Sequence, residues 1–158
     1  MAAKSRELQR QWWDWLSTGE RLLRSLTEQT VALIKRDVSS VERIQPELES
    51  MLERMRLIDE QAAATTKRLA EQVGCEPNVR SLAAVLGTAE GNQLVAIANR
   101  VKIVGANIRE RLAKNQGLIE SELIYVSGTL SLIAKAAVDQ PGPYARPEAC
   151  AVLLNEVA

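Results

Sequence analysis

Histidine and phenylalanine are absent from this sequence of 158 residues, and only two cysteines, Cys75 and Cys150, occur. The absence of histidine removes the commonest general base and every histidine-containing catalytic triad. It also removes the Glu-x-x-His pairs that hold metals in helical bundles, and two cysteines without histidine do not complete a zinc site. We therefore predict a protein that is not an enzyme, with no catalytic residue, no metal site and no cofactor.

An excess of charge of either sign is also missing, because twenty Lys and Arg residues balance twenty Asp and Glu residues. No dense basic run occurs, which disfavours a nucleic-acid partner. Uninterrupted apolar runs are short, so we predict that no helix of the chain spans a membrane and that there is no membrane insertion. Residues 1–7 are polar and lack the apolar part of a signal peptide, so we expect a cytoplasmic protein.

A pattern without proline extends from Leu94 to Ile133 and organises the rest of the chain. Apolar residues recur in it every three or four positions, which places them on one side of a continuous helix. A helix of about 40 residues would be about 60 Å long, which exceeds the diameter of a small globule. We therefore expect an elongated arrangement in which other helices lie alongside this one.

Two further patterns of helical period precede the long one. The first predicts a helix over about 5–36, and the second predicts a helix over about 38–73. Pro46 lies early in the second pattern. Because proline removes one backbone donor, we expect a kink or a restart there.

A short helix over about 78–86 and the long helix over about 90–136 complete the predicted domain of residues 1–136. The fold class that follows is all-α, an elongated antiparallel helical bundle or coiled coil of three main helices with a short connecting helix. Residues 137–158 are predicted to be a flexible tail, since they contain a Pro- and Gly-rich stretch. The amphipathic segment at 148–157 is too short to persist alone as a helix.

Asn115 occupies a position on the long apolar stripe where an aliphatic residue is expected. One interpretation is a buried amide that fixes the register of the helices at a cost in stability. Replacing it by leucine would then raise stability, whereas a lower stability with an unchanged oligomeric state would indicate a buried polar network. The other interpretation is a residue that contacts a partner.

Three tryptophans, Trp12, Trp13 and Trp15, lie close together near the start of the first predicted helix. They cannot all point the same way, because successive helical residues are rotated by about 100°. The cluster is either an aromatic plug at the end of the bundle or, at Trp13, an exposed anchor for a partner.

With these features in view, the chain resembles the FlgN family of flagellar export chaperones over most of its length. The most specific part is a short motif with an asparagine, two bulky aliphatics and a polar residue, here Asn115, Leu118, Ile119 and Glu120. A second match is Tyr144 in the Pro- and Gly-rich stretch, although Ala145 replaces the glycine that usually follows this tyrosine in the family.

The resemblance implies a cytoplasmic chaperone of the flagellar type III secretion pathway. Its clients would be the hook-filament junction, or hook-associated, proteins FlgK and FlgL, which it would hold before delivery to the export gate. A client helix would bury its apolar face against apolar residues of helical spacing. We expect client binding at Asn115, Leu118, Ile119, Leu123, Val126, Leu130, Ile133, Leu153 and Leu154. By the same resemblance, Tyr144 is the expected contact with the export gate.

A function of a different class fits the same pattern, namely a structural coiled-coil or adaptor module that self-associates. In that case Asn115 would set the register between identical chains. The two hypotheses differ for residues 137–158. A chaperone predicts a tail that becomes ordered on client binding, and a permanent scaffold predicts a tail that is already docked in the free protein.

Overall fold

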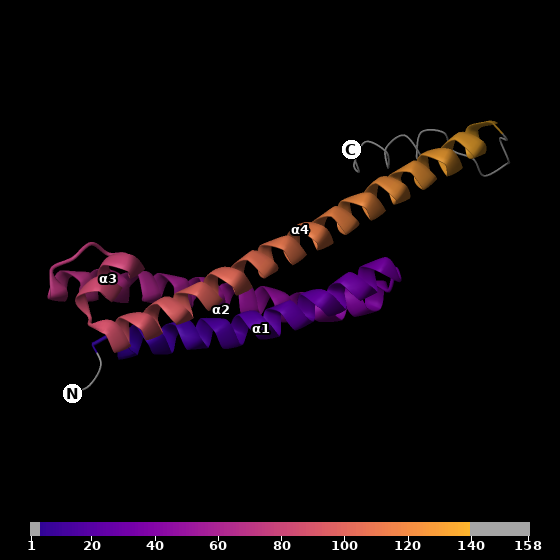
Figure 1. The fold of residues 1–158 in the computed structure, drawn as a ribbon. Helices are drawn as coiled ribbons and strands as arrows, with labels where there is room; N and C mark the ends of the chain where they lie inside the picture. The colour runs from indigo at the N-terminus through magenta and orange to yellow at the C-terminus, as the bar shows by residue number, and fades with distance from the viewer. Residues whose placement is uncertain (1–3, 140–158) are drawn as a thin grey trace. The chain divides into compact units, whose positions relative to one another are not determined.

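The computed structural model describes residues 4–139, and these form four helices and no strand. The helices are α1 (Arg6–Ile34), α2 (Val38–Val73), α3 (Val79–Val85) and α4 (Thr88–Asp139) (Figure 1). The predicted all-α class and helical bundle are confirmed. The chain divides into two compact units, an N-terminal unit of Met1–Asn115 and a C-terminal unit of Gln116–Ala158.

A tight turn between α1 and α2 makes these two helices an antiparallel hairpin (Figure 1). Arg36 adopts a left-handed conformation with φ of 56°, and its N–H donates to Leu33 O at 3.1 Å. The Asp37 N–H donates to Ala32 O at 2.9 Å, which completes a Schellman motif. The Asp37 carboxylate then accepts from the Ser40 backbone N–H at 3.1 Å and from its hydroxyl at 2.6 Å. These bonds cap α2 and lower the pKa of Asp37.

The sequence predicted either a kink or a restart of the helix at Pro46. Helix α2 continues through Pro46 as one helix, so there is no restart. The missing N–H of Pro46 leaves the Glu42 carbonyl without its helical donor. Both residues are exposed, so water can hydrate that carbonyl. The helix ends at Gly74, whose left-handed φ of 72° is readily adopted only by glycine.

Helices α1 and α4 run parallel to each other within the N-terminal unit. Ser5 bonds to Glu90 near the start of both helices, and Thr30 bonds to Asn115, with 85 positions between the partners in each pair. Glu90 also accepts the Ser5 backbone N–H at 2.6 Å, so a residue of α4 satisfies a donor at the N-terminus of α1. The constant separation shows that the two helices stay in register along this whole stretch.

The core of the N-terminal unit consists of two aliphatic clusters. The larger cluster joins α1, α2 and α4 through Trp15, Leu16, Leu22, Leu26, Ile44, Leu48, Met51, Met55, Ile58, Ile97 and Ile108. The smaller one adds α3 through Leu8, Ala62, Leu69, Ala70, Leu82 and Leu94. Gly19 permits close packing of α1 against α2 and α4, since a Cβ there would lie 3.1 Å from Val104 Cγ1 and 3.3 Å from Met55 Cε.

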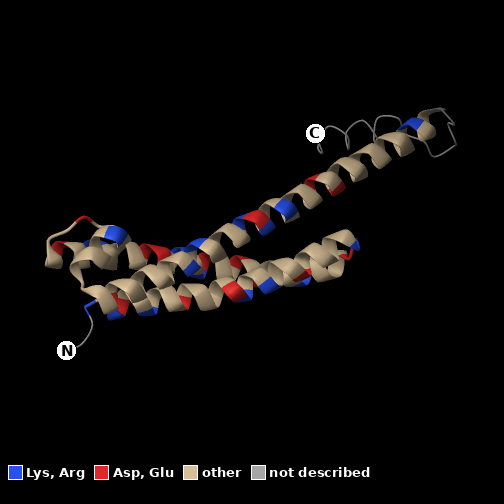
Figure 2. Ribbon diagram, in the orientation of Figure 1, with Lys and Arg blue, Asp and Glu red and all other residues tan. Residues whose placement is uncertain are grey.

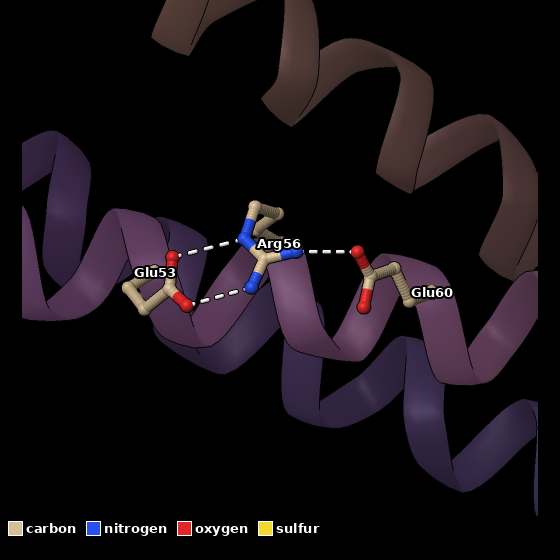
Figure 3. Close-up of polar contacts among 3 residues, drawn as sticks. All are labelled: Glu53, Arg56 and Glu60. Atoms are coloured by element: carbon tan, nitrogen blue, oxygen red, sulfur yellow. Dashed lines mark hydrogen bonds and ion pairs between the residues drawn. The ribbon is translucent and has the colours of Figure 1, made fainter.

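Charged residues recur along α2 (Figure 2), and all of them are exposed. Arg56 donates to both carboxylate oxygens of Glu53, at 2.9 Å and 2.7 Å, and it also bonds to Glu60 one turn later (Figure 3). These ion pairs lower the pKa of Glu53 and raise the pKa of Arg56. Because all three side chains are exposed, the pairs contribute little to stability.

Candidate functional site

The described part of the C-terminal unit is the last part of α4, and it is rich in exposed apolar side chains. None of the side chains from 116 to 138 is buried. The large exposed apolar residues in this range are Ile119, Leu123, Ile124, Tyr125, Val126, Leu130, Leu132, Ile133 and Val138. We call residues 118–138 the apolar segment.

The apolar segment contains six of the residues predicted to bind a client, namely Leu118, Ile119, Leu123, Val126, Leu130 and Ile133. Leu118 is half-buried, whereas Ile119 is 38% and Leu123 is 62% exposed. Val126, Leu130 and Ile133 are also at least 46% exposed. With about 100° between successive residues, all six fall within a sector of about 140°. The helix therefore brings them together on one face. The other predicted residues, Tyr144, Leu153 and Leu154, lie outside the described residues.

Four further exposed apolar residues of the same segment were not predicted from the periodicity. Ile124 is 74%, Tyr125 is 56%, Leu132 is 71% and Val138 is 56% exposed. Their helical positions fall outside the sector of the predicted stripe, so apolar side chains surround most of the helix. The run 123–126, with four apolar residues in succession, is a sequence signal that points to Ile124 and Tyr125 but not to Leu132 or Val138.

The hydropathy of α4 differs from the expectation based on short apolar runs. Within Thr88–Val138, an 18-residue window reaches a mean hydropathy of 1.2 with at most two charged residues, and none of the window is buried. Length and composition alone would therefore allow this helix to cross a membrane. A single helix of this kind is weak support for a membrane span.

Polar groups of the apolar segment bond largely within the helix. Thr129 Oγ1 donates to Tyr125 O at 3.0 Å, and Ser131 Oγ donates to Ser127 O at 3.0 Å. Charged residues are sparse along the last part of α4 (Figure 2). A partner that covers this helix would therefore leave few polar groups without hydrogen bonds.

Asn115, at the end of the N-terminal unit, is buried in a hydrogen-bond network with α1. Its side chain is 2% exposed. The amide Nδ2 donates to Leu26 O at 3.0 Å and to Gln29 Oε1 at 2.8 Å, while its Oδ1 accepts from Thr30 Oγ1 at 2.5 Å. Both hydrogens and the oxygen of the amide are thus satisfied by one helix. This arrangement matches the interpretation of Asn115 as a buried amide that fixes register.

The hydrogen-bond network of Asn115 and Gln29 extends to α2. Gln29 Nε2 donates to Gln45 Oε1 at 3.2 Å, and Gln45 Nε2 donates to Glu49 Oε1 at 3.0 Å. Gln29 is buried, whereas Gln45 and Glu49 are exposed. A chain of hydrogen bonds therefore connects the buried Asn115 of α4, through Gln29 of α1, to the exposed residues Gln45 and Glu49 of α2.

The three tryptophans divide between the core and the surface. Trp15 is 7% exposed in the larger cluster, and Trp12 is partly buried against both clusters. Trp13 is 46% exposed, and the guanidinium carbon of Arg100 lies 5.1 Å from its ring centroid. The surface position expected for at least one of these residues is therefore that of Trp13.

The buried indole of Trp15 lies near a carboxylate. Burial raises the pKa of Asp59, and the neighbouring Trp15 N–H acts in the opposite direction. That N–H nevertheless makes no hydrogen bond of good geometry with any group in residues 4–139. Asp59 and Trp15 thus form an incompletely satisfied polar contact at the edge of the core.

Comparison with known proteins identifies the family. The chain matches the family described as FlgN protein over residues 1–147, which include all four helices and Tyr144. No curated protein and no solved structure matches it. FlgN proteins are cytoplasmic chaperones of flagellar protein export. Because the match covers far more than half of the sequence, this chain belongs to the FlgN family of flagellar export chaperones.

Proposed function

We propose that this chain holds the hook-associated proteins FlgK and FlgL in the cytoplasm before export, with the apolar segment of α4 as the client-binding surface. The observation that carries the proposal is the exposure of nine large apolar side chains between Ile119 and Val138. Monomeric soluble proteins rarely expose large contiguous apolar patches without a binding role. A chaperone that receives the apolar faces of client helices has such a role.

The physical basis of binding is the burial of helical apolar faces. Each large aliphatic side chain that passes from water into an interface contributes about 1.5–3 kcal/mol before the costs of association. The predicted stripe provides anchors at i, i+3 or i+4 and i+7, which suit a client helix lying along α4. The further residues Ile124, Tyr125 and Leu132 would contact a second client helix or the flank of the first. No covalent step and no cofactor are required.

The remaining predicted residues complete the proposal. Leu153 and Leu154 of the tail would close over the client, and Tyr144 would contact the export gate. Asn115 is 2% exposed and bonds to α1. We therefore propose that it fixes the register of α4 just before the apolar segment, and that it contributes to client binding in this way.

The experiment is a calorimetric titration of the full chain with the purified terminal helical regions of FlgK and FlgL. We expect at least micromolar affinity, equivalent to about −8 kcal/mol. The double variant Leu123→Glu/Ile133→Glu should weaken binding at least tenfold, because it would bury two carboxylates in the interface. A chain ending at Ala137 should bind more weakly if the tail closes over the client.

A matched control is available in the N-terminal unit. Ile34 and Val38 are 63% and 66% exposed, close to the values for Leu123 and Ile133. The variant Ile34→Glu/Val38→Glu therefore makes the same chemical change at similar exposure and should leave client affinity unchanged. Equal weakening by both double variants, or no binding by the unmodified chain, would contradict the proposal.

Self-association is the second candidate, since apolar side chains surround most of the segment and another copy could cover them. Sedimentation velocity separates the two functions. A permanent oligomer that becomes monomeric in Leu123→Glu/Ile133→Glu, together with no client binding, would support a structural module. A monomer that binds FlgK or FlgL would support the chaperone.

A further inference from the structure

A second candidate surface lies in the N-terminal unit, where the parallel helices α1 and α4 adjoin. We call the adjoining surfaces of α1 from Trp13 to Thr27 and of α4 from Arg100 to Lys114 the α1–α4 groove. Both stretches cover fourteen helical steps, or about 21 Å. A cavity of about 340 Å³ lies at one end of the groove, lined by Leu23, Thr27, Asn107, Glu110, Arg111 and Lys114.

The α1 side of the groove provides an apolar anchor at Trp13. Its ring is 46% exposed and takes no part in either core cluster. Arg100 stacks over it at 5.1 Å, and Glu20 lies 3.7 Å from the Arg100 guanidinium. The ring is therefore held in one orientation while a large part of it stays accessible. Exposed tryptophans of this kind are typical binding hot spots.

The α4 side of the groove is basic, although the chain has no net charge. Of the charged residues between Arg100 and Lys114, Lys102 and Arg109 lie on the side away from α1. Arg100, Arg111 and Lys114 lie toward α1 together with Glu110, so this side of the helix carries a local charge of +2. At about 100° per residue, Arg100, Arg111 and Lys114 fall within a sector of about 60°, on the side that faces α1. Arg111 and Lys114 form no ion pair within residues 4–139, so their charges are available to a ligand.

We propose that the α1–α4 groove binds an acidic amphipathic helix of a partner protein. Trp13 and Leu23 receive apolar residues of that helix, and Arg111 and Lys114 pair with its carboxylates. A furrow between two parallel helices accepts a third helix by ridges-into-grooves packing. An apolar side and a basic side match a helix that is itself apolar on one face and acidic on the next. This surface is separate from the apolar segment, and the proposal does not rest on the proposed function.

The test uses two designed peptides of about 18 residues with leucines at i, i+4, i+7 and i+11. One carries glutamates on its polar face and the other carries lysines at the same positions. Binding to the full chain is measured by fluorescence anisotropy. We expect the acidic peptide to bind at least tenfold more tightly than the lysine peptide, and its affinity to fall as salt is raised.

Charge-reversal variants locate the site. Arg111→Glu/Lys114→Glu should weaken the acidic peptide at least tenfold, and Trp13→Ala should weaken it to a similar degree. Lys102 and Arg109 lie on the same helix but about 180° away from Arg100, so Lys102→Glu/Arg109→Glu makes the same charge change on the opposite side. This control should retain the affinity of the unmodified chain. Circular dichroism checks that each variant is folded, and Arg111→Gln/Lys114→Gln replaces the first variant if it is not.

Three outcomes would overturn the proposal. Equal losses in the two charge-reversal variants would show diffuse charge attraction. Loss of binding in Leu123→Glu/Ile133→Glu would show that the peptide occupies the apolar segment instead. A dimer that dissociates in Arg111→Glu/Lys114→Glu without any peptide binding would show that the groove is occupied by a second copy of the chain.

Discussion

The side-chain amide of Asn115 donates a 3.0 Å hydrogen bond to the backbone carbonyl of Leu26. The one hydrogen of the Thr30 hydroxyl is shared between two acceptors, Leu26 O at 2.9 Å and Asn115 Oδ1 at 2.5 Å. A shift of α4 by one helical turn would bring Arg111 or Ile119 to this position. Neither side chain can both donate to the carbonyl of Leu26 and accept from Thr30. The contact therefore fixes the register of α4 on α1 within one chain.

We predict that Asn115→Leu lowers the stability of the protein. The substitution removes the donor to Gln29 Oε1, and Gln29 is buried, whereas the Thr30 hydroxyl keeps Leu26 O as its acceptor. An unsatisfied buried polar group costs about 1–3 kcal/mol, which exceeds the gain from the additional apolar surface of leucine. Urea unfolding of the variant should show a lower midpoint with an unchanged oligomeric state.

A double-mutant cycle checks the cause of this loss. In Asn115→Leu/Gln29→Leu the Gln29 acceptor is also removed, so the double variant should lose less stability than the sum of the two single variants. Strict additivity would show that Asn115 and Gln29 do not interact. A higher stability of Asn115→Leu alone would restore the interpretation in which the amide only disfavours other registers.

Two glycines of α4 should respond to alanine in opposite directions. A Cβ at Gly91 would lie 2.4 Å from the backbone oxygen of Ala83, whereas no atom lies within 4 Å of a Cβ at Gly117. Gly91→Ala should therefore destabilise by about 1–3 kcal/mol through displacement of α3. Gly117→Ala should stabilise by up to about 1 kcal/mol through higher helix propensity. Thermal unfolding followed by circular dichroism measures both, and equal shifts would contradict the packing at Gly91.

The tryptophans should differ sharply in their contributions to stability. Trp15 is 7% exposed, so Trp15→Ala should cost about 3–5 kcal/mol through the cavity that it creates. Trp13 is 46% exposed and contacts Arg100, so Trp13→Ala should cost less than about 1 kcal/mol. Chemical unfolding of the two variants under identical conditions tests this difference. A loss at Trp13 as large as that at Trp15 would place Trp13 in the core.

Asp59→Asn should stabilise the protein at neutral pH and should have less effect in acid. Burial raises the pKa of Asp59 in the folded state, so the folded state binds its proton more tightly than the unfolded state does. Ionisation therefore costs stability as pH rises from the unfolded pKa through the higher folded pKa. Asparagine removes this cost. Unfolding at pH 3 and pH 7 should show a larger gain at pH 7, and a constant gain would point to a cause other than ionisation.

The helical class of this protein follows from local features of the sequence. Apolar residues spaced by three and four predict amphipathic helices in any environment, because the period of the backbone is 3.6 residues. The absence of histidine equally limits the chemistry whatever the fold. The family match over residues 1–147 agrees with the resemblance that rested on Asn115, Leu118 and Ile119.

The sequence determined by itself that the chain forms amphipathic helices and lacks histidine chemistry, since both depend on residue type and spacing alone. Only the tertiary structure decided between the alternative interpretations of individual residues, such as a buried or a partner-contacting Asn115. It placed Asn115 against Leu26 of a helix 89 positions away, and it placed Arg100 over Trp13. Such contacts depend on how distant helices are set in register. Spacing along one helix carries no information about the partner that faces it.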